Sequence, residues 1–300
     1  MRRKTTAVRI GNVVLSSEEP VLVQSMLNTS TREVDACVEQ AIRIIEAGGR
    51  LVRITAPGVK EAEMLGEIHR RLRERGYTTP ISADIHFVAE AASVAARYVE
   101  KVRINPGNFA DKRATFKKLT YTDEEYAAEL EILRQKFTEF LEVCRQYGTA
   151  VRIGTNHGSL SDRIMSRYGD TPAGMVEATM EYLRVCQACD FKDVVISLKS
   201  SDCRTMVDAV RLLVEKMEAE GMCYPLHLGV TEAGEGEDGR IRSAVGIGTL
   251  LNEGIGDTIR VSLTEEPEAE IPVACELARI CSEPEYLKGW TPLKGECSKP

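Results

Sequence analysis

Residues 51–55 read Leu51-Val52-Arg53-Ile54-Thr55, a short apolar run with one arginine at its centre. The same pattern of an arginine between β-branched residues returns at 102–104, 151–153 and 259–261. Side chains alternate between the two faces of a strand, so each arginine points away from its apolar neighbours. The pattern therefore predicts four strands that bury aliphatic side chains on one face and an arginine on the other.

Further β-rich runs bring the number of predicted strands to eight. They cover 21–26, 51–55, 81–86, 101–105, 150–155, 193–199, 225–231 and 257–263. Segments of helical period separate them. This alternation predicts an α/β fold, a TIM-type (β/α)8 barrel over residues 1–281. A doubly wound open sheet is the alternative, and the count of eight favours the barrel.

Helix starts are marked by capping residues. Ser30 with Glu33, and Thr122 with Glu125, have the spacing of a capping box. Thr171 before Pro172, and Ser201, are further N-cap candidates. The helices expected there include an amphipathic one over 122–147, one over 172–189 and a last one from 269 to 281.

Two regions between or after these helices are expected to lack regular structure. Residues 234–239 are acidic and glycine-rich, which predicts a flexible loop and a mobile lid over the barrel mouth. Residues 282–300 hold three prolines, two glycines and no period, which predicts a tail or the start of a linker.

The four arginines are the first candidates for a binding site. In a barrel their apolar neighbours face the helices, so Arg53, Arg103, Arg152 and Arg260 point into the lumen. A buried guanidinium needs a partner. Each one alone could pair with a lumen carboxylate, but four together favour a pocket for a polyanion, because arginine binds phosphate with two donors at once.

Polar residues also collect at the strand ends, where barrel active sites lie. A spacing of two places Asp84 with His86, and Arg260 with Ser262, on the same side of a strand. The strand-end residues, with the arginines that they join, are Asp84, His86, Arg103, Asn105, Asn156, Lys199, Thr231, Glu232, Arg260 and Ser262. Five cations among amide and hydroxyl donors suit a compact diphosphate. Glu232, Asp84 and His86 are acid–base candidates, although His86 could be a structural histidine.

Composition limits the partners. The chain has 300 residues, 39 basic and 46 acidic, for a net charge of −7. That charge argues against nucleic acid and anionic membranes. The start of the sequence has no apolar signal region and no run is long enough to span a bilayer, so we expect a soluble cytoplasmic protein. Nine scattered cysteines are read as reduced thiols. Cys186 and Cys189 form a C-x-x-C on one helical face without a second pair, so no metal site is expected.

At these residues the sequence resembles the 4-hydroxy-3-methylbut-2-enyl diphosphate synthase family of the non-mevalonate isoprenoid pathway. The matching motifs span most of the chain, and 108–126 and 234–251 resemble the long, three-domain form. The motifs are Gln-Ser-Met at 24–26, Asp-Ile-His-Phe at 84–87, Arg-Ile-Asn-Pro-Gly at 103–107, Arg-Ile-Gly-Thr-Asn-His-Gly-Ser at 152–159, Leu-Gly-Val-Thr-Glu-Ala-Gly at 228–234 and Gly-Asp-Thr-Ile-Arg-Val-Ser at 256–262.

The resemblance implies an oxidoreductase barrel that binds 2-C-methyl-D-erythritol 2,4-cyclodiphosphate. It implies that Asp84, His86 and Glu232 face the ring of the substrate. The remaining site residues would hold the diphosphate: Arg53, Arg103, Asn105, Arg152, Asn156, Lys199, Thr231, Arg260 and Ser262. The family opens the ring by a two-electron reduction with loss of water. The electrons come from a [4Fe–4S] cluster, which receives them from ferredoxin or flavodoxin.

The sequence departs from the family at the cluster. The family holds it with three cysteines and a glutamate in a C-terminal domain, and Cys275, Cys281 and Cys297 have a different spacing. We therefore expect a substrate-binding barrel without bound cluster, inactive alone, which precedes insert and iron–sulfur domains. Whether it forms a homodimer stays open. Two alternatives also remain: a Schiff-base aldolase of a phosphorylated substrate that uses Lys199, and a non-catalytic phosphometabolite-binding module.

Overall fold

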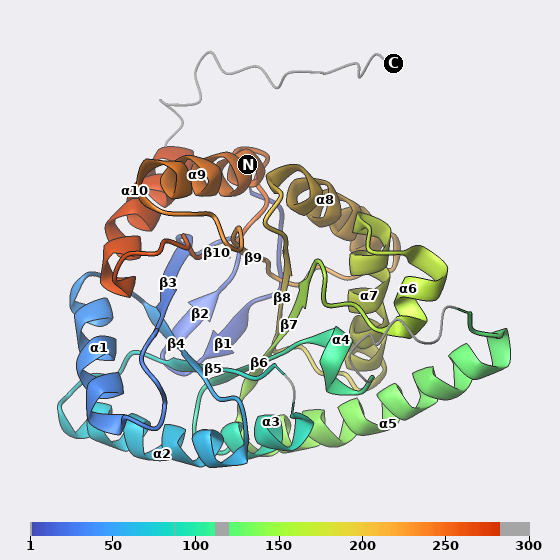
Figure 1. Cartoon of the computed structure of the whole chain (residues 1–300), viewed down its shortest axis with the longest axis horizontal. Coiled ribbons are helices and arrows are strands. Elements are labelled where there is room, and N and C mark those ends of the chain that lie inside the picture. The colour runs from blue at the N-terminus through green and yellow to red at the C-terminus, as the bar shows by residue number, and fades with distance from the viewer. Residues whose placement is uncertain (1, 87, 112–119, 283–300) are drawn as a thin grey trace.

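The computed structural model describes residues 2–86, 88–111 and 120–282. Ten strands are found in these residues, and eight of them alternate with helices around a central barrel (Figure 1). The strands are β1 Val8–Ile10, β2 Val13–Leu15, β3 Leu22–Met26, β4 Leu51–Thr55, β5 Ile81–Asp84, β6 Lys101–Ile104, β7 Ala150–Asn156, β8 Val194–Lys199, β9 His227–Leu228 and β10 Thr258–Ile259.

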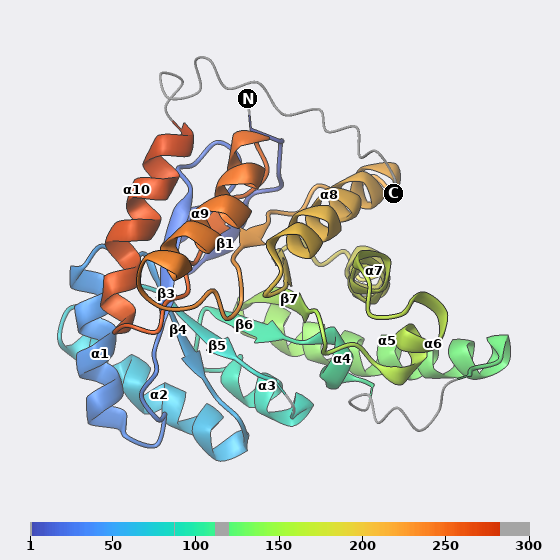
Figure 2. The same ribbon diagram turned by 45° about the horizontal axis from the view of Figure 1, so that its top comes forward.

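Helices surround the strands, and α10 lies beside α9 and near α1 on one side of the barrel (Figure 2). A short 3-10 helix, η1 Pro267–Ala269, leads into α10. The helices are α1 Val34–Glu46, α2 Val59–Glu74, α3 Ala89–Ala95, α4 Pro106–Phe109, α5 Asp123–Tyr147, α6 Asp162–Tyr168, α7 Pro172–Ala188, α8 Cys203–Ala219, α9 Gly236–Asn252 and α10 Glu270–Ser282.

The sheet is parallel and closes on itself. Its strand order is β8-β7-β6-β5-β4-β3-β10-β9. A parallel bridge between Ile196 and Leu226 joins β8 to the segment before β9 and closes the ring. The aliphatic neighbours of the arginines are buried against the helices, as Val52, Ile54 and Val102 show. The predicted (β/α)8 barrel is confirmed.

A hairpin that the sequence analysis did not predict seals the amino-terminal end of the barrel. Strands β1 and β2 pair antiparallel around a turn at Gly11, whose φ is +57°. Their buried side chains form one apolar cluster with the first residues of the barrel strands: Val8, Ile10, Val13, Leu15, Leu22, Leu51, Ala150 and Val195. The Gly11-Asn12 pair is a typical two-residue hairpin turn, but strands of three residues are too short to show a period.

Several local predictions are corrected. Helix α1 begins after Glu33 with no side-chain cap, so the capping box proposed for Ser30 and Glu33 is wrong. Asp202, rather than Ser201, caps α8 by accepting the Thr205 N–H. The box at Thr122 and Glu125 and the Thr171 cap are confirmed.

The loop predicted over 234–239 is wrong from Gly236 onward, where helix α9 begins. Its acidic residues Glu237 and Asp238 lie in the first turn, where negative charge stabilises a helix. Strands β5, β9 and β10 are shorter than predicted because their polar ends continue as loops at the barrel mouth. Within the described residues, no helix has both the length and the apolar character needed to cross a membrane.

Candidate functional site

The four arginines of the repeated pattern lie in the lumen, as predicted. Arg53, Arg103 and Arg152 are at most 9% exposed, and Arg260 is partly buried. Arg103 and Arg152 are direct partners in the register of β6 and β7. Side-chain alternation brings all four to the inner face of one barrel. The sequence therefore concentrates positive charge inside a chain whose net charge is negative.

Asp84 lies at the centre of this group. Its Oδ2 is 3.1 Å from Arg53 Nη2, and its Oδ1 accepts a hydrogen bond of 3.2 Å from Arg103 Nη1. Arg152 Nη2 lies 3.9 Å from Oδ1, and His86 Nε2 is 3.0 Å from Oδ2. The carboxylate is fully buried. Burial alone would raise its pKa, but Arg53, Arg103 and His86 outweigh burial and hold the pKa of Asp84 well below its ordinary value.

Arg260 has a carboxylate partner of its own. Its Nε and Nη2 donate to Glu270 Oε2 and Oε1 at 3.0 and 2.9 Å. Glu270 is 1% exposed and comes from the first position of α10, a helix outside the sheet. Glu270 was not among the predicted site residues, because no local sequence pattern indicates that a glutamate at the start of a helix reaches into the barrel.

Positive charge still exceeds negative charge in the lumen. Within the described residues, two buried carboxylates, Asp84 and Glu270, are the counter-charges of six cationic side chains. The six are Arg53, Lys101, Arg103, Arg152, Lys199 and Arg260. Burial and the surrounding arginines hold the pKa of Lys199 well below its ordinary value. Burial also lowers the pKa of Arg53 to about 10, although Asp84 opposes this.

Several donors in this layer have no hydrogen-bond partner within the described part of the chain. They are the Nε atoms of Arg53, Arg103 and Arg152 and the Nζ of Lys101. A buried donor without a partner is costly. These donors are therefore available to an anionic ligand.

Two glycines leave space for the cations. A Cβ on Gly154 would lie 2.5 Å from Arg103 Nε and 3.0 Å from Arg152 Nη1. A Cβ on Gly229 would lie 2.9 Å from Lys199 Nζ. Both glycines are close-approach positions, where a side chain would displace the charged groups.

The other predicted site residues surround the mouth. Asn156 ends β7 as the register partner of Lys199. Asn105 is buried, and its side chain accepts the Gly107 N–H as the cap of α4. Thr231 and Ser262 follow β9 and β10 and are partly buried. Glu232 is exposed and has a positive φ of +52°, a backbone conformation that is uncommon for a glutamate.

Three further lumen residues were missed. Lys101 is fully buried two residues before Arg103, so the period-two rule that found Arg103 would have found it. Gln24 and His227 face each other across β3 and β9, and Gln24 Nε2 donates to His227 Nδ1 at 2.8 Å. Burial and the charge of Lys199 lower the pKa of His227.

The family comparison agrees with the barrel fold. The family model described as the GcpE TIM-barrel domain matches residues 5–275. The chain belongs to the GcpE family. It is 63% identical over 284 residues to the 4-hydroxy-3-methylbut-2-en-1-yl diphosphate synthase (flavodoxin) of Parabacteroides distasonis, covering 95% of this chain and 46% of that protein. The chloroplastic, ferredoxin-type synthase of Arabidopsis thaliana is 52% identical, over 93% of this chain and 38% of its own length. This GcpE chain thus spans about half the length, or less, of these curated relatives.

Solved structures support the fold alone. Yersinia pestis dihydropteroate synthase aligns with 92% of this GcpE chain and 99% of its own, with a TM-score of 0.57 and 14% identity. Sialic acid synthetase from Leptospira borgpetersenii aligns with a TM-score of 0.58 and 10% identity, over 99% of this chain and 95% of its own. Both matches cover nearly the whole barrel.

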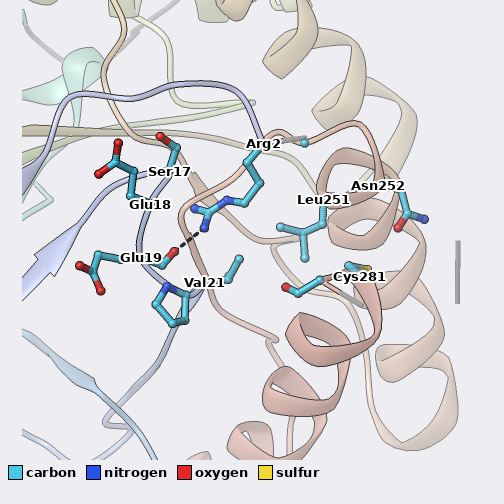
Figure 3. A pocket seen from close by; sticks show the side chains of 11 residues that line it. Arg2, Ser17, Glu18, Glu19, Val21, Leu251, Asn252 and Cys281 are labelled. Atoms are coloured by element: carbon cyan, nitrogen blue, oxygen red, sulfur yellow. Dashed lines mark hydrogen bonds between the residues drawn. The ribbon is translucent and has the colours of Figure 1, made fainter. Parts of the chain in front are cut away.

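A cavity of about 590 Å³ lies at the opposite end of the GcpE barrel, between the segment before β3 and the carboxyl ends of α9 and α10 (Figure 3). Arg2 extends into it and bonds to the Glu19 carbonyl and to Asp257. Barrel active sites lie at the carboxyl ends of the strands, so this cavity is not the candidate site.

Cys144 of α5 and Cys189 at the end of α7 are close enough to Cys186 to affect its titration. Cys186 is buried in α7, and burial raises its pKa well above the ordinary value. No group of three or more metal-ligating side chains is found in residues 2–86, 88–111 and 120–282. Ser282, the first residue of the tail predicted over 282–300, is the last residue of α10, and the rest of that segment, with Cys297, lies outside the described residues.

Proposed function

We propose that this chain is the substrate-binding barrel of a 4-hydroxy-3-methylbut-2-enyl diphosphate synthase and that its lumen binds 2-C-methyl-D-erythritol 2,4-cyclodiphosphate. The excess of buried positive charge is the observation that carries the proposal. Six cationic side chains and two carboxylates leave a surplus of positive charge that a diphosphate would partly neutralise. The relatives at 52–63% identity, which are named as this synthase, supply the reaction.

The diphosphate would contact the unpaired donors. Arg53, Arg103 and Arg152 each offer a free Nε, and Lys199 offers an ammonium that lacks a carboxylate partner in the described residues. A phosphate would stabilise the protonated form of Lys199 and raise its lowered pKa. Asn105, Asn156, Thr231, Ser262 and the remaining Arg260 nitrogen would orient the ligand at the rim.

The acid–base candidates differ in what they can do. Asp84 is ionised and shared by arginines, so its role is to orient Arg53 and Arg103 rather than to give a proton. His86, bonded to Asp84, would face the substrate from the same strand end. Glu232 is the exposed carboxylate at the mouth and is the better candidate for proton transfer.

The overall reaction takes up two electrons and two protons and releases one water. Flavodoxin or ferredoxin, which the names of the relatives specify, is the proposed electron donor. The side chains described in this barrel do not provide ligands for the [4Fe–4S] cluster of the complete enzyme. We infer that the ligands belong to a separate domain and that the barrel alone binds without reducing. A cytoplasmic location and a homodimer stay predictions.

Titration calorimetry with the cyclic diphosphate tests this proposal. We expect binding by the unmodified chain and a loss of affinity of about 10-fold or more in Arg152→Ala, because a hydrogen bond between charged groups contributes about 1.5–3 kcal/mol. Arg260→Ala should also bind more weakly. Arg9→Ala, on the exposed face of β1, is the control. Unchanged affinity in both lumen variants, with circular dichroism showing a folded barrel, would place the binding site elsewhere.

Lys199 supports a second candidate function. A buried lysine with a lowered pKa is a suitable amine for Schiff-base chemistry, so an aldolase of a phosphorylated carbonyl compound is the alternative. Borohydride reduction in the presence of such a compound would then trap an adduct on Lys199, detectable by mass spectrometry. The absence of an adduct would rule the aldolase out. A non-catalytic module would bind the cyclic diphosphate without turnover even with the complementary domains and reductant supplied.

A further inference from the structure

Three polar side chains lie beneath the arginine layer and have no partner. Ser82 on β5, Lys101 on β6 and Thr258 on β10 are each 0% exposed. Ser82 Oγ, Lys101 Nζ and Thr258 Oγ1 make no hydrogen bond within the described part of the chain. Three buried donors without partners in one barrel need an explanation.

Strand register places these side chains on the same level of the lumen. Ser82 and Lys101 are direct register partners, and each comes two residues before a lumen residue, Asp84 and Arg103. Thr258 comes two residues before Arg260 and is the register partner of His227. Strand β10 lies four strands from β6 in the closed eight-stranded ring, so Thr258 faces Lys101 from across the lumen.

This level is closed on both sides. Below it, the β1–β2 hairpin packs against Leu51 and Ala150 as a dry apolar floor. Above it, Asp84 and its three arginines form a layer of ion pairs. A diphosphate would have to break that layer to reach Lys101, so a ligand at this level must be smaller than a diphosphate.

Burial holds the pKa of Lys101 well below its ordinary value, and Arg152 and Arg53 lower it further, whereas Asp84 opposes them. An anion bound at this level would stabilise the protonated ammonium of Lys101. The nearest carboxylate, Asp84, is already shared by Arg53, Arg103 and His86. The donors at this level are one ammonium and two hydroxyl groups. They come from different strands, so they suit a spherical anion, which accepts hydrogen bonds from any direction.

We propose that Lys101, Ser82 and Thr258 form a binding site for a small monovalent anion, chloride under physiological conditions, beneath the diphosphate site. The ammonium supplies the charge and the two hydroxyl groups supply further donors. The bound anion would offset the repulsion among the lumen cations when no diphosphate is present. This site is separate from the one proposed for substrate.

Crystals of the 300-residue chain soaked in sodium bromide test the site directly. We expect an anomalous bromine peak within contact distance of Lys101 Nζ, and no peak there in Lys101→Met. A non-anomalous solvent peak in the unmodified chain would identify a water and would overturn the proposal. A bromide that persists in Lys101→Met would overturn it as well.

Thermal unfolding gives a second readout that needs no crystal. At constant ionic strength, with gluconate replacing chloride, each tenfold rise in chloride above its Kd should raise the Tm by about 3 °C. Lys101→Met should show no such rise, and Thr258→Val a weaker one. Arg9→Met removes one positive charge from an exposed position near the floor and should respond like the unmodified chain. A Tm that is independent of chloride in the unmodified chain would contradict the proposal.

Discussion

Glu270, the first residue of α10, holds Arg260 inside the barrel through two hydrogen bonds of 2.9 and 3.0 Å. The same carboxylate accepts the Ser25 hydroxyl at 2.6 Å and the Leu263 N–H at 3.2 Å. A residue from the outer helical layer thus neutralises one lumen cation and fastens α10 to β3. It also orients Arg260, so that binding and stability depend on the same side chain.

Glu270→Gln is expected to lower the free energy of unfolding by about 3–5 kcal/mol, because it leaves the buried Arg260 without its counter-charge. Urea denaturation measures this. Glu276→Gln is the control, because Glu276 lies on the exposed face of the same helix and is paired with Arg279 within the described residues; this variant should leave the urea midpoint unchanged. Equal midpoints for both variants would show that the Arg260–Glu270 pair contributes no net stability.

Asp84→Asn removes the carboxylate that three arginines share. We expect a loss of about 3–5 kcal/mol in the free energy of unfolding. The cyclic diphosphate should then raise the Tm of Asp84→Asn by more than it raises that of the unmodified chain, because phosphate charge replaces the lost carboxylate. Asp84→Glu, which keeps the charge, serves as the control. A smaller ligand-induced rise in Asp84→Asn would indicate that Asp84 positions the ligand rather than the arginines.

The lumen arginines could be predicted from sequence because alternation along a strand depends on local geometry alone. When two aliphatic neighbours point from a strand toward the helices, the arginine between them points to the opposite face of the sheet. In a closed barrel that face lines the lumen. The observed burial of Arg103 and Arg152, each 2% exposed, follows from this rule. The same alternation predicts that Lys101, two residues before Arg103, also points into the lumen.

The partners of these arginines could not be predicted in the same way. Glu270 is ten residues from Arg260 in sequence and reaches it because the chain passes through η1 and then begins α10 beside β3. Asp84 was identified at a strand end, but its pairing with Arg53 and Arg152 depends on the stagger between strands. Helix α9 was missed at its start because glycines at 236 and 239 suggest a loop, whereas the acidic first turn stabilises a helix.

Gly154→Ala tests whether space beside the arginines is required. The added methyl would lie 2.5 Å from Arg103 Nε, so Arg103 and Arg152 must move. We expect a destabilisation of about 1–3 kcal/mol, typical of overpacking, and a loss of diphosphate affinity in calorimetry. Gly248→Ala on α9, where a Cβ meets Leu277 at an ordinary 3.5 Å, should bind as the unmodified chain does. Undiminished affinity in Gly154→Ala would mean that the arginine positions tolerate displacement.

The lowered pKa of Lys199 predicts that the free energy of unfolding depends on pH in the alkaline range. Burial and the neighbouring arginines hold its pKa in the folded chain well below its ordinary value, whereas in the unfolded chain the pKa is about 10.4. Between these two values the unfolded chain holds a proton that the folded chain has lost, so stability rises with pH across this window and the gain is lost as pH falls through the folded pKa.

Lys199→Met should therefore reduce the slope of unfolding free energy against pH, by up to about 1.4 kcal/mol per pH unit within that window. Urea denaturation from neutral pH to pH 10 measures the slope without ligand. Lys192→Met is the matched control, since the Lys192 side chain is 70% exposed and should leave the slope unchanged. With the cyclic diphosphate present, the phosphate charge should raise the pKa of Lys199 and the unmodified chain should approach the flatter profile. A slope that is identical in Lys199→Met and the unmodified chain would show that Lys199 is protonated in the free barrel, and the Schiff-base alternative would lose its support.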